Sequence, residues 1–269
     1  MDGVCGSQTW ATLVEAGYRP GDRLLYYTSP LLRGDDVADL QRRLGALGFD
    51  AGRVDGIFGP DTQAALLEFQ RNTGLTTDAV CGPTTLAALD RLSARATDRP
   101  VAGVRERDLL RRSPPTLHGR RIIVGDLGGA AALAQAVRRT LSGRGAFAVV
   151  VPHPDPSAQA VQANGVGADA YLGLASAGSG CSTSFYAGHG YESPGGRRLA
   201  ECVEVEVPPV LGARSCPPAG MTVPVLRETR MPAVLCELGP PRVVVERGGA
   251  LAQAFGRAFT RWVEGLGDV

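Results

Sequence analysis

The sequence predicts an α/β domain, with a mixed and mostly parallel sheet covered by helices on both faces, preceded by a small all-α domain of three helices. Two observations lead to this prediction. Strand-like and helix-like segments alternate from residue 121 onward, and a short repeat with helical periodicity fills the part before residue 93. The chain has 269 residues, of which 44% are hydrophobic and 20% charged, so we expect two domains with real cores.

Charge and hydropathy exclude several classes of partner. The formal net charge is +1, and every basic residue is Arg, so no strong field draws the chain to nucleic acid or to an acidic membrane. No apolar run reaches the roughly 18 residues of a membrane span. The opening MDGVCGSQTW lacks a basic start followed by an apolar run, so no secretory signal and a cytoplasmic location are expected.

A repeat organises the first third of the chain. Residues 54–66 align with 77–89, and residues 2–13 match the second copy again. The identical pairs of the first alignment are Asp55/Asp78, Gly59/Gly82, Pro60/Pro83, Thr62/Thr85, Ala64/Ala87, Ala65/Ala88 and Leu66/Leu89. We therefore predict the second half of an incomplete first repeat at 1–27 and a complete module at 28–92.

Within the module, the apolar spacing predicts three helices. The segment from Asp35 places Val37, Leu40, Leu44 and Leu47 on one face and ends at Gly48. A second helix follows Pro60 and buries Ala65, Leu66 and Phe69, because Pro favours a first helical turn. A third covers 85–92.

Residues 93–269 are predicted to form a linker followed by an α/β domain. Residues 93–119 are rich in Arg, Pro and Ser and predict a linker with a short helix near 105–112. Residues 120–269 predict strands at 121–126, 147–151, 170–176, 184–188 and 231–239, with helices between them and a long closing helix.

Residues 33–90 resemble the peptidoglycan-binding domain of bacterial cell-wall hydrolases. The matching frame is Gly34, Val37, Leu40, Gln41, Leu44, Gly48, Asp55, Gly56, Phe58, Gly59, Thr62, Ala65, Phe69, Gln70, Gly74, Leu75, Asp78, Gly82, Thr85 and Leu89. The resemblance implies peptidoglycan or its precursors as the ligand. Asp55, Phe58 and Thr62 are candidate ligand-binding residues, although turn geometry and helix capping account for most of this pattern.

Residues 120–266 resemble the zinc-dependent N-acetylmuramoyl-L-alanine amidases. The resemblance rests on the strand RRIIV with the Gly128–Gly129 turn, on QANGVGAD at 162–169, on the strand ending in LGLAS, and on RMPAVLCELG at 230–239. The combination of modules is most similar to the CwlM-type amidase homologues of actinobacteria. The resemblance implies an amidase fold, in which His, Glu and His hold one zinc and a Glu serves as general base.

The residues expected to hold that zinc are missing here. Gly125 to Gly129 replace the motif of the first ligand without a His, no Asp or Glu occurs between Leu127 and Pro154, and Ala175 stands where the third ligand is expected. The Arg expected a few residues before the Ala-Asn pair is Gln159. Only Glu237, the candidate base, remains, so we predict no metal and no cofactor, with zinc only if the chain is an active amidase.

Several other residues have side chains or backbone groups that could bind a metal or an anion. His153 and His189 are alternative metal ligands, although both lie in predicted loops, and His118 lies in the linker. Asp126 and Gly128 lie in a turn before a helix that could cradle an anion through its backbone donors. The six cysteines lack CxxC spacing and predict buried free thiols, with a Cys202–Cys216 bridge left open.

Two functions follow from these observations. The first is a peptidoglycan- or precursor-binding regulatory or scaffold protein of cell-wall biosynthesis, with a catalytically degenerate amidase fold. The resemblance implies action in the cytoplasm on the enzyme that commits UDP-N-acetylglucosamine to the wall, a peptidoglycan-precursor synthesis enzyme. The alternative is a divergent active amidase whose metal site uses His153, Asp126 or His189. A binding module without regulatory output is the third possibility.

Overall fold

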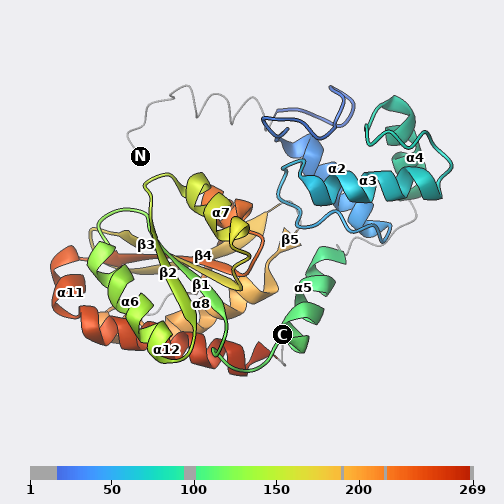
Figure 1. Cartoon of the computed structure of the whole chain (residues 1–269). Helices are drawn as coiled ribbons and strands as arrows, with labels where there is room; N and C mark the ends of the chain where they lie inside the picture. Colours follow the sequence, from blue (N-terminus) through green and yellow to red (C-terminus); the bar gives the residue numbers. More distant parts are fainter. Residues whose placement is uncertain (1–16, 94–100, 189–190, 215–216, 267–269) are drawn as a thin grey trace. The chain divides into compact units, whose positions relative to one another are not determined.

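The computed structural model describes residues 17–93, 101–188, 191–214 and 217–266 (Figure 1). The chain divides into two compact units, one formed by Met1–Arg105 with His189–Tyr191 and the other by Glu106–Gly188 with Glu192–Val269. The predicted incomplete repeat at 1–27 lies mostly outside the described residues.

The helical unit contains the three predicted helices. They are α2 (Asp35–Ala46), α3 (Pro60–Asn72) and α4 (Pro83–Ser93). Val37, Leu44, Leu66 and Phe69 are fully buried, as the helical spacing predicted, and they pack with Phe58 and Leu89 in one core. Gly48 adopts a left-handed φ of 91° just after α2, in agreement with its predicted role as a helix stop.

The α/β unit alternates strands and helices along the chain. The elements from residue 101 onward are α5 (Val101–Arg112), β1 (Arg121–Asp126), α6 (Ala131–Gly143), β2 (Phe147–Pro152), α7 (Pro156–Gly165), β3 (Ala170–Ser176), β4 (Gly180–Gly188), β5 (Tyr191–Glu192), α8 (Pro194–Glu206), α9 (Pro208–Leu211), β6 (Ala219–Met221), α10 (Pro224–Glu228), β7 (Ala233–Gly239), α11 (Pro241–Glu246) and α12 (Gly248–Glu264). The predicted mixed, mostly parallel sheet is confirmed.

The strands form a sheet of order β2-β1-β3-β7-β4-β5, and β6 pairs with β4. Strands β2, β1, β3 and β7 run parallel, whereas β4 is antiparallel to β7. Parallel strands end at one edge, so the carboxyl ends of β1, β3 and β7 lie next to one another.

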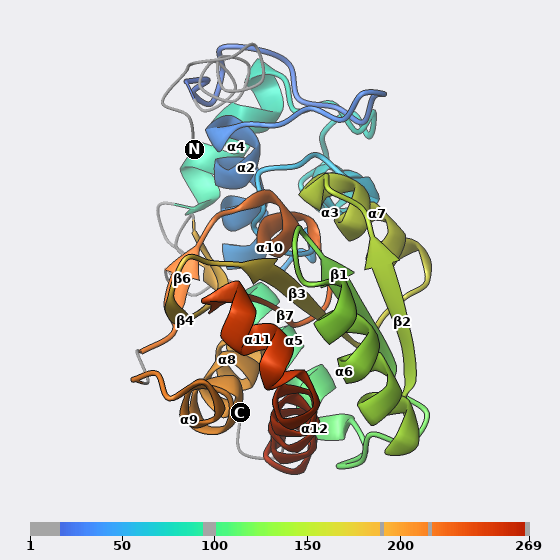
Figure 2. The ribbon, with the colours of Figure 1, turned by 90° about the vertical axis from the view of Figure 1, so that its left-hand side faces the viewer.

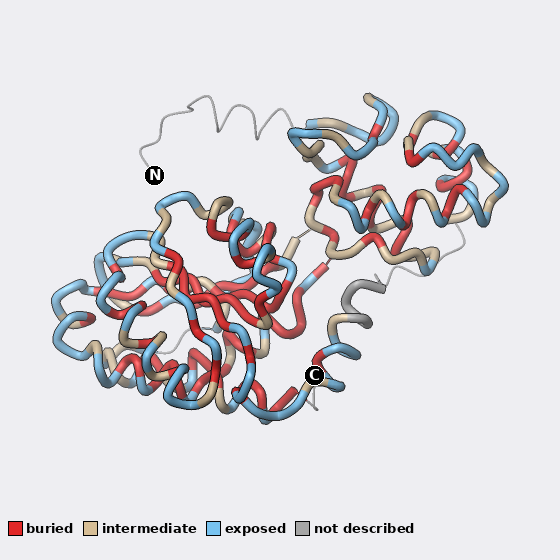
Figure 3. The backbone as a smooth tube through the Cα atoms, in the orientation of Figure 1, coloured by how far each residue is buried: buried red, intermediate tan, exposed pale blue. Residues whose placement is uncertain are grey.

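Helices cover both faces of the sheet. Helices α6, α8 and α12 lie on one face, and α7 and α10 on the other (Figures 1 and 2). The first face holds the main core, in which Trp262, Phe255 and Phe259 of α12 are fully buried. Buried backbone runs along most of the sheet (Figure 3). Among the described residues, no helix is long and apolar enough to cross a membrane.

The short elements were not predicted. Strands β5 and β6 and helices α9, α10 and α11 are each six residues or shorter. Helix α5 is longer than the predicted 105–112 and fills much of the predicted linker. Strand β4 begins at Gly180, four residues before the predicted 184–188, because its first half pairs with the end of β7.

Candidate functional site

The helical unit repeats one buried hydrogen-bond network. In the first copy, Gln41 Nε2 donates to Asp55 Oδ1 at 2.8 Å, to the Ile57 carbonyl at 3.0 Å and to Thr62 Oγ1 at 3.1 Å. Gln41 Oε1 accepts from the backbone N–H groups of Asp55 and Gly56. The amide of one helix thereby fixes the Asp–Gly turn and the start of the next helix.

The second copy uses the equivalent residues. Gln70 Nε2 donates to Asp78 Oδ1 at 2.8 Å, to the Val80 carbonyl at 3.1 Å and to Thr85 Oγ1 at 3.3 Å. Hydrogen bonds to the Val80 N–H and Gln70 favour the charged form of Asp78 and lower the pKa of its carboxyl. Ala79 occupies the position of Gly56 and keeps its left-handed conformation, with φ of 60°.

These networks explain the candidate ligand-binding residues of the module. Thr62 and Phe58 are 1% and 0% exposed, and Asp55 bonds to Gln41 and to the Ile57 N–H. The structure therefore uses them for the turn and the core. Sequence reasoning did not assign a role to Gln41 and Gln70, although a Gln on the buried face of two consecutive helices is a signal for such a network.

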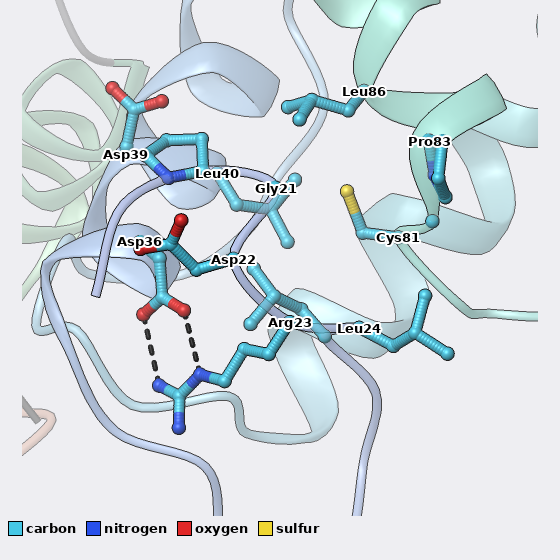
Figure 4. Close-up of a pocket in the computed structure, with 13 residues that line it drawn as sticks. Gly21, Asp22, Arg23, Leu24, Asp36, Asp39, Leu40, Cys81, Pro83 and Leu86 are labelled. Atoms are coloured by element: carbon cyan, nitrogen blue, oxygen red, sulfur yellow. Dashed lines mark hydrogen bonds and ion pairs between the residues drawn. The ribbon is translucent and has the colours of Figure 1, made fainter.

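A cavity of about 230 Å³ lies elsewhere on the helical unit (Figure 4). The segment Pro20–Leu25 forms one wall, and the other walls come from Asp36, Asp39 and Leu40 of α2 and from Cys81, Gly82, Pro83 and Leu86. An antiparallel bridge between Leu25 and Cys81 holds the walls together, with hydrogen bonds in both directions. A volume of this size suits a small group such as one sugar ring substituent or one amino-acid side chain, because drug-sized ligands need roughly 300 Å³ or more.

An ion pair forms the polar side of this cavity. Arg23 Nε and Nη2 donate to the two oxygens of Asp36 at 2.7 and 3.0 Å, and Asp36 is 1% exposed (Figure 4). Asp36 lies in the first turn of α2, where a negative charge favours the helix. On the apolar side, burial raises the pKa of the Cys81 thiol to about 11, so this group stays neutral near pH 7.

In the α/β unit, four residues lie side by side across neighbouring strands, in a row formed by Leu127, Ala175, Glu237 and Ser182. Register places Ala175 of β3 beside Glu237 of β7, and Glu237 beside Ser182 of β4. Ser182 Oγ donates to Glu237 Oε2 at 3.1 Å, and the Glu237 side chain is exposed. Leu127, whose N–H bonds the Leu174 carbonyl, extends the row past the end of β1.

Leu127 packs on β3 next to this row, at Gly173, two residues before Ala175. A Cβ placed on Gly173 would lie 3.1 Å from Leu127 Cδ1 and 3.3 Å from Leu235 Cδ1. The two leucines therefore pack directly on the Gly173 backbone. The row thus offers one carboxylate beside Leu and Ala, which is a poor fit to a zinc ion, because zinc sites need three or four N, S or O ligands from the protein.

In the Gly-rich turn after β1, the backbone N–H groups of Gly128 and Ala130 bond to the carboxylate of Asp126. Asp126 Oδ1 accepts from the N–H groups of Gly128 and Ala130 at 3.0 and 3.1 Å. The turn also packs on β3, where the Ser176 N–H donates to the Gly128 carbonyl. The backbone donors that suggested anion binding at Asp126 and Gly128 are therefore already bonded within the turn.

Gln159 links the end of β1, the residue after β2 and a tyrosine at the start of β3. Its Nε2 donates to the carbonyls of Asp126 and His153 at 2.8 and 2.6 Å, and its Oε1 accepts from Tyr171 Oη at 2.5 Å. Gln159 is fully buried, and burial raises the pKa of Tyr171. A Cβ on Gly125 would collide with the side chains of Gln159 and Tyr171, which explains a glycine near the end of β1.

The histidines do not meet in the described part of the chain. His153 Nδ1 accepts from the Asp155 N–H at 3.1 Å, His118 is exposed in the loop before β1, and His189 lies outside the described residues. Among the residues described, no three His, Cys, Asp or Glu side chains are grouped to hold a metal ion.

The cysteines of the described residues are buried free thiols. They are Cys81, Cys181, Cys202 and Cys236. Cys202 is therefore unbridged, and Cys216 lies outside the described residues. Cys236 points to the face opposite Glu237, as strand alternation predicted, and burial raises its pKa well above the ordinary value.

Comparisons with known proteins agree with both units. Residues 33–89 match the family model of the peptidoglycan binding domain. The chain is 38% identical over 272 residues to the N-acetylmuramoyl-L-alanine amidase CwlM of Mycobacterium tuberculosis, an alignment that covers 89% of this chain and 67% of that protein. The chain belongs to the CwlM family.

Other similarities of this CwlM-family chain are partial. It is 48% identical over 52 residues to a spore cortex-lytic enzyme of Oceanobacillus iheyensis, covering 19% of each protein. Among solved structures, the amidase Ami1 of Mycobacterium smegmatis matches 55% of this chain and 98% of its own, with 13% identity and a TM-score of 0.47. An amidase of Clostridium difficile 630 matches 53% and 95%, with 16% identity and a TM-score of 0.46.

Proposed function

We propose that this CwlM-family chain binds peptidoglycan or its precursors and acts as a regulatory or scaffold protein of cell-wall biosynthesis, without cleaving the amide bond. The observation that supports this most is the row of Leu127, Ala175 and Glu237 at the strand ends. In this row Glu237 holds the position of the general base of the amidases, while Leu127 and Ala175 stand where metal ligands would be needed.

The chemistry favours a non-catalytic domain. Amide cleavage by this family depends on a metal that lowers the pKa of bound water to about 7 and polarises the carbonyl. Leu127 and Ala175 carry no donor atoms in their side chains. Glu237 alone can supply general-base help of about 10²–10⁴-fold, which is small against the barrier of an unactivated amide.

A divergent amidase is the second candidate, since the Mycobacterium tuberculosis relative bears that name. It would need a metal site built from His153, Asp126 or His189. The bonds of His153 to the Asp155 N–H and of Asp126 to its own turn weigh against their participation. This candidate therefore depends on a rearrangement of both loops.

We place the ligand site of the helical unit at the cavity beside Arg23 and Asp36. The cavity combines an apolar wall with a charged pair, a lining suited to an acyl or peptide group carried on a polar ligand. Leu24, which is 51% exposed, lines it, whereas Tyr27, which is 48% exposed, does not.

This placement can be tested by sedimentation with insoluble peptidoglycan. Leu24→Asp should weaken binding about tenfold, because a charge replaces apolar contact area, while Tyr27→Asp serves as the control with equal exposure. Equal binding by both variants and the parent chain would exclude the cavity as the site.

The proposed partner is a peptidoglycan-precursor synthesis enzyme, and the proposed location is the cytoplasm. Unbridged Cys81, Cys181, Cys202 and Cys236 are compatible with a reducing compartment. Adding the purified chain to the enzyme that commits UDP-N-acetylglucosamine to the wall, taken from the same organism, should change its rate. An unchanged rate over a range of chain concentrations would argue against this partner.

A hydrolysis assay separates the two candidates. Purified peptidoglycan is incubated with the zinc-supplemented chain, and new L-Ala amino termini are measured, with Glu237→Ala as the matched control. The regulatory proposal expects no release above the control. Release that a chelator abolishes and that Glu237→Ala loses would make the chain an amidase.

A further inference from the structure

Strand β2 is the outermost strand on one side of the sheet (Figure 2). Its inner edge pairs with β1 over all six residues, from Arg121–Phe147 to Asp126–Pro152. None of the described residues pairs with its outer edge. An unpaired edge of this kind is a template for another strand.

Within the part of the chain that the structure describes, the outer edge of β2 carries none of the usual protections against pairing. Monomeric proteins blunt their edge strands with charged residues, bulges or central prolines. The sequence of β2, FAVVVP, contains no charge, and its pairing with β1 has no bulge. Its one proline, Pro152, is the last residue.

Apolar side chains are exposed along the same strand. Phe147 is 68% exposed and Val149 is 54% exposed, and both project to the face that carries α7. Val166, the residue that follows α7, is 50% exposed. Arg121, the neighbour of Phe147 on β1, does not extend over this edge, because its Nη1 donates to the Val166 carbonyl at 2.8 Å.

The backbone groups that face outward can be identified. The Phe147 N–H donates inward to the Arg120 carbonyl at 2.7 Å. Since successive N–H groups of a strand point to opposite edges, those of Val149 and Val151 also point inward. Ala148 and Val150 therefore direct both their N–H and C=O groups outward.

These groups complement a second copy of themselves. In an antiparallel pairing centred on Val149, Ala148 of each copy lies opposite Val150 of the other. Each of these two residue pairs exchanges two N–H···O=C bonds, which gives four hydrogen bonds in total. Val149 then meets its own counterpart as a non-hydrogen-bonded pair. The same pairing places Phe147 of each copy opposite Val151 of the other, so the apolar residues at both ends of the strand face one another.

We propose that β2 is a homodimer interface, in which two copies of this chain join their sheets through an antiparallel β2–β2 contact centred on Val149. A two-fold contact of this type closes on itself and leaves no further free edge at β2. One strand pair with its flanking apolar side chains is a small interface, so we expect a dissociation constant of roughly tens of micromolar.

Sedimentation velocity over a range of concentrations tests the dimer. The parent chain should shift from monomer to dimer, and Val149→Lys should raise the dissociation constant at least about tenfold, because like charges would lie directly opposite each other. Val149→Glu should do the same, and an equimolar mixture of the two variants should restore a dimer. Val161→Lys on α7 is the matched control, since Val161 is 67% exposed and lies outside β2.

Hydrogen exchange tests the pairing itself. The amides of Ala148 and Val150 should become protected as concentration rises, while those of Phe147, Val149 and Val151 stay protected throughout. A parent chain that remains monomeric at the highest concentration overturns the proposal, as does an equal effect of Val161→Lys. Protection of Ala148 and Val150 in the monomer would also overturn it, because another segment would then cover the edge.

Discussion

Replacement of Gln41 by Ala tests the assigned network of the helical unit. Gln41 makes five hydrogen bonds, three as donor and two as acceptor, and it is 2% exposed. A hydrogen bond of this kind contributes about 1 kcal/mol net, and a buried group left without its partner costs about as much again. Asp55 is only partly buried, so its carboxylate can bond to water once Gln41 is gone, which limits the cost. We therefore expect the free energy of unfolding of the helical unit to fall by about 3–5 kcal/mol.

Native-state hydrogen exchange can measure this loss in the full-length chain. The amides of α2 and α3 should lose protection by that amount in Gln41→Ala. Those of α12 should not change, because α12 belongs to the other compact unit. Gln63→Ala, in α3 and outside the network, is the control and should cost less than about 1 kcal/mol.

Two results would refute this reasoning. Equal protection in Gln41→Ala and Gln63→Ala would mean that the turn is held by its backbone alone. A matching loss of protection in α12 would mean that the variant destabilises the chain as a whole.

Three further predictions concern other positions. Gly125→Ala should cost the α/β unit about 3 kcal/mol by overpacking against Gln159, measured by urea unfolding with Trp262 fluorescence, whereas Gly143→Ala, which meets open space, should be neutral; equal midpoints would contradict it. Ala79→Gly should stabilise the helical unit by about 1 kcal/mol by relieving the left-handed conformation, and an unchanged midpoint would count against the relief of strain. The pKa of Cys81 is raised to about 11 in the folded chain, from about 9 in the unfolded chain, so the neutral thiol stabilises the fold fully below pH 9. This contribution, about 2–3 kcal/mol, should be lost as the pH rises to about 11. Alkaline unfolding of Cys81→Ala should not show this loss.

The sequence was sufficient for the long elements and insufficient for the short ones. Helices α2 and α3 were predictable because a 3.6-residue spacing of apolar residues has one stable solution. Strand β6 has three exposed residues, and it exists because it pairs with β4. Its stability comes from a partner more than thirty residues away, which local patterns do not encode.

The sequence motifs predict which ligands are missing from the candidate site, and they predict Ala175 in place of one of them, but they do not predict how the neighbouring side chains pack. The absence of His at the end of β1 and at Ala175 could be read from the motifs. The packing of Leu127 on Gly173 could not, since it depends on the register between β1 and β3. The cavity likewise depends on the bridge from Leu25 to Cys81, which joins segments far apart in the sequence.

The central claim is that the strand ends of the α/β unit lack the inner ligands of a zinc amidase. The most direct measurement is the zinc content of the purified chain after zinc loading and removal of free metal, read by mass spectrometry. Far less than one zinc per chain is expected, unchanged by Glu237→Ala. One tightly held zinc per chain, lost in Glu237→Ala, would contradict the claim and restore the amidase as the leading function.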